Sequence, residues 1–216
     1  MKQLFTLIIA LVGVLPAFAD GVTPNLTVYK QFKPATIQLV DGRTLQQPLA
    51  NIFLKNSNLL YVSGSLTKEA RLANILSVDF EDRHYVKIDT LLAYQVDTVA
   101  NNALFCATLI DLVAYNTLLK NNKMITNLDL SANSSLMQTA TIDLEDVGDI
   151  HFPVINVFYY RLNGEYVRVH ERHLQRVLNK EQRRMLRTYV NERSFSWNDP
   201  DSLMKLLKSI TEFEDK

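Results

Sequence analysis

The sequence predicts a mainly β fold, α+β overall: an antiparallel sandwich or barrel-like domain that carries short helices at its C-terminus. Between residues 35 and 170, many short strand-like runs follow one another, separated by Asn, Asp and Gly. No helical pattern of crossover length lies between these runs, which favours antiparallel pairing over a parallel α/β sheet. After residue 170 the apolar period changes from two to about 3.6, which is typical of helices.

The chain divides into a predicted signal peptide over residues 1–19, a β-rich domain over 20–170, and a helical segment over 171–216 that packs on it. The leader has a charged start, an apolar run over residues 4–15 and an Ala-Phe-Ala cleavage site. The alternative is an uncleaved anchor, which the shortness of the apolar run disfavours. Asp20 stands where a bacterial lipoprotein would carry Cys. We therefore expect an exported protein, periplasmic or extracellular, that is not lipid-anchored and has no transmembrane segment.

The first strands are expected on either side of two turns. Residues 35–40 lead into Asp41-Gly42, a hairpin signal, and residues 51–55 turn at 56–58 into a strand over 59–62. Residues 65–74 fit either a short helical turn or a loop between strands. Further strands are predicted over residues 75–80, 84–88, 91–99, 103–111, 112–119, 123–130 and 136–144.

A hairpin is predicted around Asn163-Gly164, because a two-residue type I′ turn needs positive φ at both positions. Pairing outward from the turn places Arg161 opposite Tyr166 and Tyr159 opposite Arg168. One face is then apolar and available to a core: Phe158, Tyr160, Leu162, Val167 and Val169. The other face is aromatic and cationic and holds the candidate binding residues: Tyr159, Arg161, Tyr166, Arg168 and His170.

This outer hairpin face has two possible interpretations, one functional and one structural. Its Tyr and Arg side chains could stack across the strands as cation–π pairs and form a platform for an anionic or sugar-like ligand. Alternatively, the face is stabilised for its own sake or is covered by the helices.

The helical segment carries recognisable ends. Asn179, followed three residues later by Gln182, resembles a capping box, so two short helices are expected to break there. Asp199 as N-cap and Pro200 at the first position begin a last helix. Its apolar stripe is expected to dock on the β domain and comprises Leu203, Leu206, Leu207 and Ile210.

The formal charge is balanced, with 23 basic and 23 acidic residues, which predicts no general attraction to nucleic acid. The charges are unevenly distributed, however. Residues 124–160 contain no Lys or Arg, whereas residues 161–193 contain nine basic and four acidic residues. These blocks complement each other across the fold or lie on solvated faces, unless the basic block binds an anionic partner.

Motifs indicate no catalytic residue, metal site or cofactor. The six glycines are too far apart for a dinucleotide-binding, P-loop or nucleophile-elbow motif. His170 and His173 lack the HExxH spacing, and the SxxK matches at Ser65 and Ser202 lack a following KTG. Cys106, the only cysteine, lies in an apolar run that favours a small buried side chain over a nucleophile.

Residues 32–43 (FKPATIQLVDGR), 51–61 and 78–85 (VDFEDRHY) resemble segments of uncharacterised secreted proteins from Bacteroidota. This resemblance covers the first half of the mature chain and implies an envelope location without any activity. The sequence therefore predicts an exported, non-catalytic binding or accessory protein of the cell envelope, with an anionic or glycan ligand or an envelope protein as its partner. The alternatives are a secreted hydrolase with dispersed catalytic residues and a structural component of an envelope assembly.

Overall fold

The computed structural model describes residues 22–23, 25–122 and 151–212, and in them eleven strands form one antiparallel sheet. This confirms the mainly β prediction. The strands are β1 (Val22–Thr23), β2 (Lys33–Leu39), β3 (Thr44–Phe53), β4 (Asn58–Ser63), β5 (Leu66–Glu69), β6 (Ile75–Asp79), β7 (His84–Ile88), β8 (Leu91–Val99), β9 (Asn102–Ile110), β10 (Phe152–Leu162) and β11 (Glu165–Arg168). The helices are α1 (Leu112–Asn122), α2 (Glu171–Val177), α3 (Lys180–Val190) and α4 (Pro200–Thr211), with a 3-10 turn η1 (Leu72–Asn74).

The strand order is β1-β10-β9-β8-β7-β6-β2-β3-β4-β5, with β11 paired to β10. Two meanders, β2 to β5 and β6 to β9, are joined because β2 pairs with β6 as well as with β3. The segment that the sequence left open, residues 65–74, contains both the short strand β5 and the turn η1.

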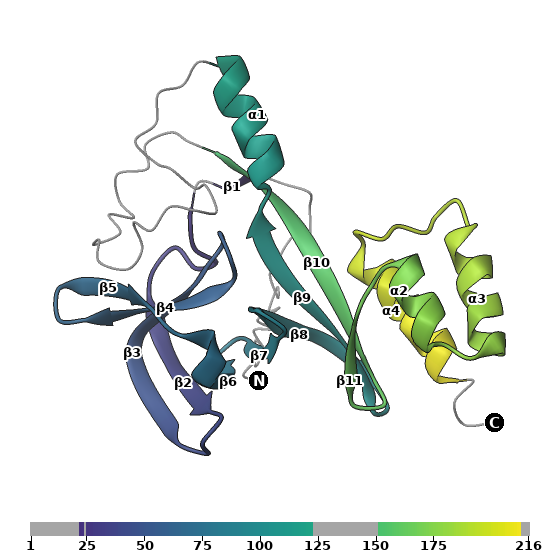
Figure 1. Cartoon of the computed structure of the whole chain (residues 1–216), viewed down its shortest axis with the longest axis horizontal. Coiled ribbons are helices and arrows are strands. Elements are labelled where there is room, and N and C mark those ends of the chain that lie inside the picture. The colour runs from purple at the N-terminus through teal and green to yellow at the C-terminus, as the bar shows by residue number, and fades with distance from the viewer. Residues whose placement is uncertain (1–21, 24, 123–150, 213–216) are drawn as a thin grey trace, which may run out of the picture.

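The turn between β3 and β4 closes the sheet on itself. The Ser57 hydroxyl donates to the Leu92 carbonyl oxygen at 2.6 Å, and the Leu92 amide donates back to the Ser57 carbonyl at 3.1 Å. The Ile110 amide donates to the Leu54 carbonyl at 2.7 Å. These bonds tie the turn to β8 and β9, so the first strands curl into a barrel-like lobe (Figure 1).

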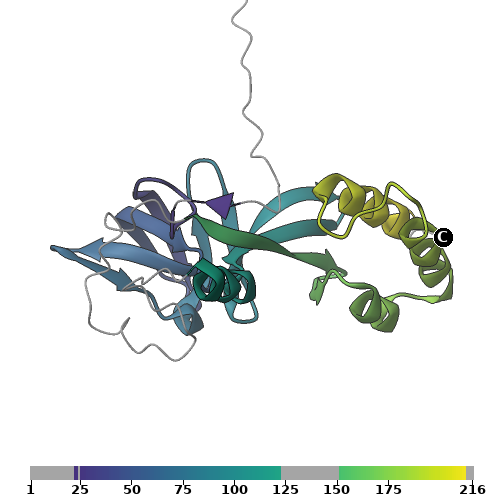
Figure 2. The same ribbon diagram turned by 90° about the horizontal axis from the view of Figure 1, so that it is seen from above.

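Helices α2 to α4 lie at the opposite end of the long strands from that lobe (Figure 2). One apolar cluster runs from Ile52 and Leu59 in the lobe through Leu104 in β9 to Leu174 and Leu207 in the helices. The helical segment and the sheet therefore share one core, which is stabilised by the burial of apolar surface.

The hairpin turn and the helix caps that the sequence predicts are present in the structure. The hairpin register is confirmed, with Arg161 opposite Tyr166 and Tyr159 opposite Arg168. Asn163 and Gly164 have φ of 51° and 86°, as a type I′ turn requires. The capping box at Asn179 and the cap at Asp199 are both present.

The strand predicted over residues 112–119 is wrong, because this segment is helix α1. The Asp111 side chain accepts hydrogen bonds from the amides of Val113 and Ala114, at 3.0 and 2.9 Å, and so caps a helix that follows β9 directly. The strands predicted over 123–130 and 136–144 and the signal peptide lie outside the described residues. Within the part of the chain that the structure describes, no helix has the length and apolar character needed to cross a membrane.

Candidate functional site

The outer face of the β10–β11 hairpin presents two arginines and a tyrosine to solvent. Tyr166 is 39% exposed, Arg168 is exposed and Arg161 is partly buried. Cross-strand pairing brings Arg161 and Tyr166 together, as the sequence predicted. These three residues are the part of the predicted site that lies on this face and is open to solvent.

Phe105 of β9 organises this face, and sequence reasoning missed it. The Tyr166 ring meets the Phe105 ring edge-on at 5.4 Å, and the Arg161 guanidinium lies 5.9 Å from the Phe105 centroid. The expected stacking of Arg161 on Tyr166 is thus replaced by contacts of both side chains with one buried ring. Small side chains at Ala103 and Ala107 leave room for it, and the Ala-x-Phe-x-Ala alternation is the signal that could have found it.

Tyr159 lies beneath this face rather than on it, since only 7% of its surface is exposed. It pairs across the strands with Phe105 and packs in the same apolar cluster. Burial raises the pKa of Tyr159, an effect that the nearby Arg168 partly opposes. Tyr159 therefore supports the face and does not offer a ring to a ligand.

His170 leaves the hairpin face and joins the helical end. Its Nδ1 accepts a hydrogen bond from the Arg172 amide at 3.3 Å, which caps α2. Its ring stacks on Trp197 at 6.1 Å and meets the edge of His173 at 6.0 Å. In the described ranges, no group of three or more His, Cys, Asp or Glu residues could hold a metal ion.

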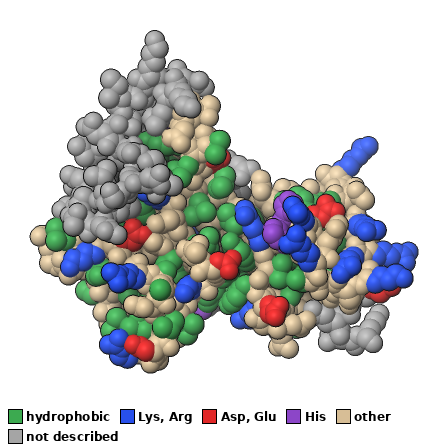
Figure 3. Space-filling view, in the orientation of Figure 1, with side chains coloured by type: hydrophobic (Ala, Val, Ile, Leu, Met, Phe, Trp, Pro, Cys, Tyr) green, Lys and Arg blue, Asp and Glu red, His purple; other side chains and the backbone are tan. Residues whose placement is uncertain are grey.

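Helices α2 and α3 carry exposed positive charge next to the hairpin. Figure 3 shows Lys and Arg side chains gathered over this end of the molecule, with histidine side chains beside them. The exposed cations of these two helices are Arg172, Arg176, Lys180, Arg183, Arg184 and Arg187. Among the described residues, the ion pairs lie elsewhere, at Lys33–Asp82, Arg43–Asp41 and His84–Asp79. None of these cations forms an ion pair with another described residue, and they outnumber the two acidic residues of the same helices, Glu171 and Glu181.

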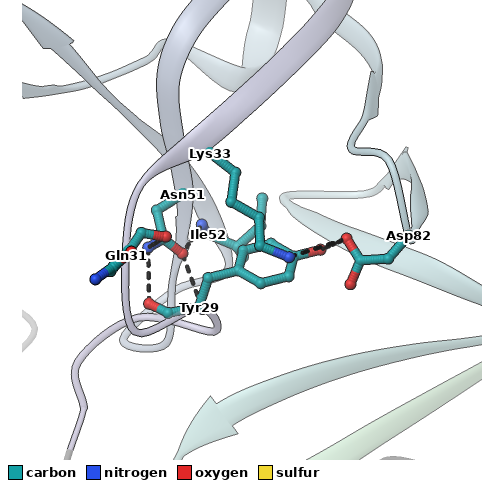
Figure 4. A network of polar contacts seen from close by, with 6 residues as sticks. All are labelled: Tyr29, Gln31, Lys33, Asn51, Ile52 and Asp82. Carbon is teal, nitrogen blue, oxygen red and sulfur yellow. Dashed lines mark hydrogen bonds and ion pairs between the residues drawn. The ribbon is translucent and has the colours of Figure 1, made fainter. Parts of the chain in front are cut away.

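A second polar network lies at the other end of the molecule, in the barrel-like lobe (Figure 4). The Asn51 side chain bonds both backbone groups of Tyr29, accepting from its amide at 3.1 Å and donating to its carbonyl at 2.8 Å. The Tyr29 hydroxyl donates to Asp82 at 3.0 Å, and Lys33 pairs with the same carboxylate at 3.4 Å. This network fastens the segment before β2 to the sheet.

Cys106 has the surroundings of a core residue rather than those of a reactive thiol. The residue is fully buried in the core, and burial raises the pKa of its thiol to about 12.

Comparison with protein-family models, with curated proteins and with solved structures finds no match for this chain. The hairpin and the neighbouring helices present guanidinium groups, which can donate hydrogen bonds to an anion, and one exposed tyrosine ring.

Proposed function

We propose that this chain is an exported, non-catalytic binding or accessory protein of the cell envelope, and that its ligand is an anionic glycan. The observation that carries the proposal is the excess of exposed cations without ion pairs on and beside the hairpin, here named the basic surface. It comprises Arg161, Tyr166 and Arg168 of the hairpin and Arg172, Arg176, Lys180, Arg183, Arg184 and Arg187 of the helices. Because α2 lies against β11 and α3 against α2, these residues belong to neighbouring elements.

The residue types on the basic surface suit a glycan that carries carboxylate or sulfate groups. A guanidinium can donate two parallel N–H bonds to such a group, which a Lys ammonium cannot match in geometry. The exposed Tyr166 ring adds a flat apolar surface against which a sugar ring can pack. Export is supported by the leader pattern of residues 1–19.

The test is a binding titration with heparin, a sulfated glycan, at several salt concentrations. The expected result is saturable binding that weakens as salt rises, because exposed charges are screened. The double variant Arg161→Ala with Arg168→Ala is expected to bind at least about tenfold more weakly, since each charged hydrogen bond contributes about 1.5 kcal/mol or more.

Arg43→Ala is the matched control, because Arg43 is exposed in the lobe and paired with Asp41. This variant is expected to bind heparin like the wild-type protein. Equal loss in the control and the double variant would contradict the proposal, as would tighter binding to vesicles of anionic lipid than to heparin. Export is tested by cell fractionation and N-terminal sequencing, with Asp20 expected as the first residue of the exported chain.

A further inference from the structure

His170 lies between two members of the basic surface, Arg168 two residues before it and Arg172 two residues after it. All three side chains are exposed. Consecutive Cα atoms are about 3.8 Å apart, so both arginines begin within about 8 Å of His170. Figure 3 shows histidine side chains beside the Lys and Arg side chains at this end of the molecule. The His170 imidazole is therefore part of the same exposed surface.

Three contacts hold the His170 ring in one orientation. Its Nδ1 accepts a hydrogen bond from the Arg172 backbone amide at 3.3 Å. The ring stacks on Trp197 with an angle of 21° between the planes, and His173 meets it edge-on. Trp197 is itself held by Phe195, whose ring lies 4.9 Å away at 90°, and both pack against the core. A side chain that is held in this way loses little conformational freedom on binding.

The hydrogen bond at Nδ1 decides which nitrogen of His170 carries the proton. A neutral imidazole has one N–H donor and one acceptor nitrogen, so a ring that accepts at Nδ1 donates from Nε2. Among the described residues, no group accepts a hydrogen bond from this Nε2–H. The Nε2–H is therefore an oriented donor that His170 offers to a ligand.

We propose that His170 is a binding residue of the basic surface and donates from Nε2–H to a sulfate or carboxylate oxygen of the glycan. This inference rests on the proposed function, because it names a contact within the same surface. A hydrogen bond with one charged partner is stronger than a neutral one. The His170 donor is neutral, unlike those of the surrounding arginines, so its contribution to affinity does not depend on the release of salt ions.

The test is a heparin titration of His170→Asn at several salt concentrations and at about pH 8, where histidine side chains are ordinarily uncharged. Asparagine keeps the helix cap, since it is a preferred N-cap residue, but it lacks the imidazole Nε2–H. Binding is expected to be at least about tenfold weaker, because a hydrogen bond to a charged group is lost. The slope of log affinity against log salt should match the wild-type slope, whereas Arg168→Ala should reduce it by about one.

Trp197 provides a second measurement that needs no substitution. It is the only tryptophan in the sequence, and the His170 ring stacks on it. Its fluorescence emission is therefore expected to change when heparin binds to the wild-type protein, and to change less in His170→Asn. Unchanged emission of the wild-type protein at saturating heparin would contradict the inference.

His84→Asn is the matched control, because His84 is an exposed histidine at the start of β7 that pairs with Asp79. It is expected to bind heparin like the wild-type protein. Wild-type affinity in His170→Asn would overturn the inference, and so would an equal loss in His84→Asn or a salt slope reduced as much as in Arg168→Ala. The proposed function fails separately, when the wild-type protein does not bind heparin or when Arg161→Ala with Arg168→Ala binds it unchanged.

Discussion

The Tyr160 hydroxyl of β10 donates a hydrogen bond of 2.6 Å to the Leu203 carbonyl oxygen in the first turns of α4. Both residues are fully buried. Toward the other end of α4, the Asn102 side-chain amide donates to the Thr211 hydroxyl at 3.0 Å. Two buried polar contacts therefore fix where α4 sits on the sheet, in addition to its apolar stripe.

Tyr160→Phe is expected to lower the free energy of unfolding by about 1 kcal/mol, because the ring is kept and one buried hydrogen bond is lost. Urea unfolding measures this change. Tyr166→Phe, on the exposed face of the same hairpin, is the control and should stay within about 0.5 kcal/mol of wild type. Equal stabilities of the two variants would show that the Tyr160 hydroxyl does not contribute to docking.

Asn51→Ala is expected to be the most destabilising of these substitutions. It removes the side-chain oxygen that accepts from the Tyr29 and Ile52 backbone amides, in a site where Asn51 is fully buried. It also removes one of two donors to the Tyr29 carbonyl, which the Thr27 hydroxyl still bonds at 2.8 Å. Each group left unpaired costs about 1 to 3 kcal/mol, so a loss above about 2 kcal/mol is expected in urea unfolding. Lys33→Gln breaks an exposed ion pair and the cation–π contact of Lys33 with the Tyr29 ring, and should cost about 1 kcal/mol or less.

Gly164→Ala is expected to lower the free energy of unfolding by about 1 kcal/mol through backbone strain alone. Gly164 has a φ of 86°, and an added Cβ would meet no atom within 4 Å. Asn163→Gly should be nearly neutral, because glycine adopts the φ of 51° at that position freely. Chemical denaturation of both variants checks this, and a neutral Gly164→Ala would contradict it.

The cap of α4 predicts a pH dependence. The hydrogen bond from Ser202, assisted by backbone amides, lowers the pKa of Asp199 in the folded protein. A lowered folded pKa means that the charged cap stabilises the fold above the unfolded pKa of about 4 and loses this contribution as pH falls. Asp199→Ala should therefore cost about 1 kcal/mol at pH 7 and progressively less below about pH 4. Urea denaturation of both proteins at several pH values measures this difference. Asp199→Asn keeps a neutral cap, so its contribution to stability is expected not to change with pH in this range.

The Cys106 thiol is expected to resist modification in the native protein. With its pKa raised to about 12, almost no thiolate is present at pH 8, and the side chain is fully buried. Ellman's reagent should react slowly with the folded protein and rapidly after unfolding in urea. Rapid reaction under native conditions would mean that the core around β9 opens readily.

Sequence patterns predicted those features whose cause lies within a few residues. The hairpin register follows from the positive φ that Asn163 and Gly164 supply, and the helix starts at Asn179 and Asp199 follow from side chains that bond nearby amides. Helix α1 was missed because its cap, Asp111, directly follows β9, in a run with strand-like composition. Because no turn separates strand β9 from helix α1, the change from a strand-like to a helix-like apolar period is hard to recognise in the sequence.

The candidate sites depended on the tertiary structure for their composition. Phe105 reaches Arg161 and Tyr166 only because β9 pairs with β10, and His170 stacks on Trp197 only because the segment between α3 and α4 returns to the start of α2. The sequence by itself determined the β-rich class, the hairpin and the caps, since local backbone preference and side-chain alternation encode them. Only the tertiary structure decided which rings and cations meet and which are buried, because those contacts arise from pairing between strands distant in the chain.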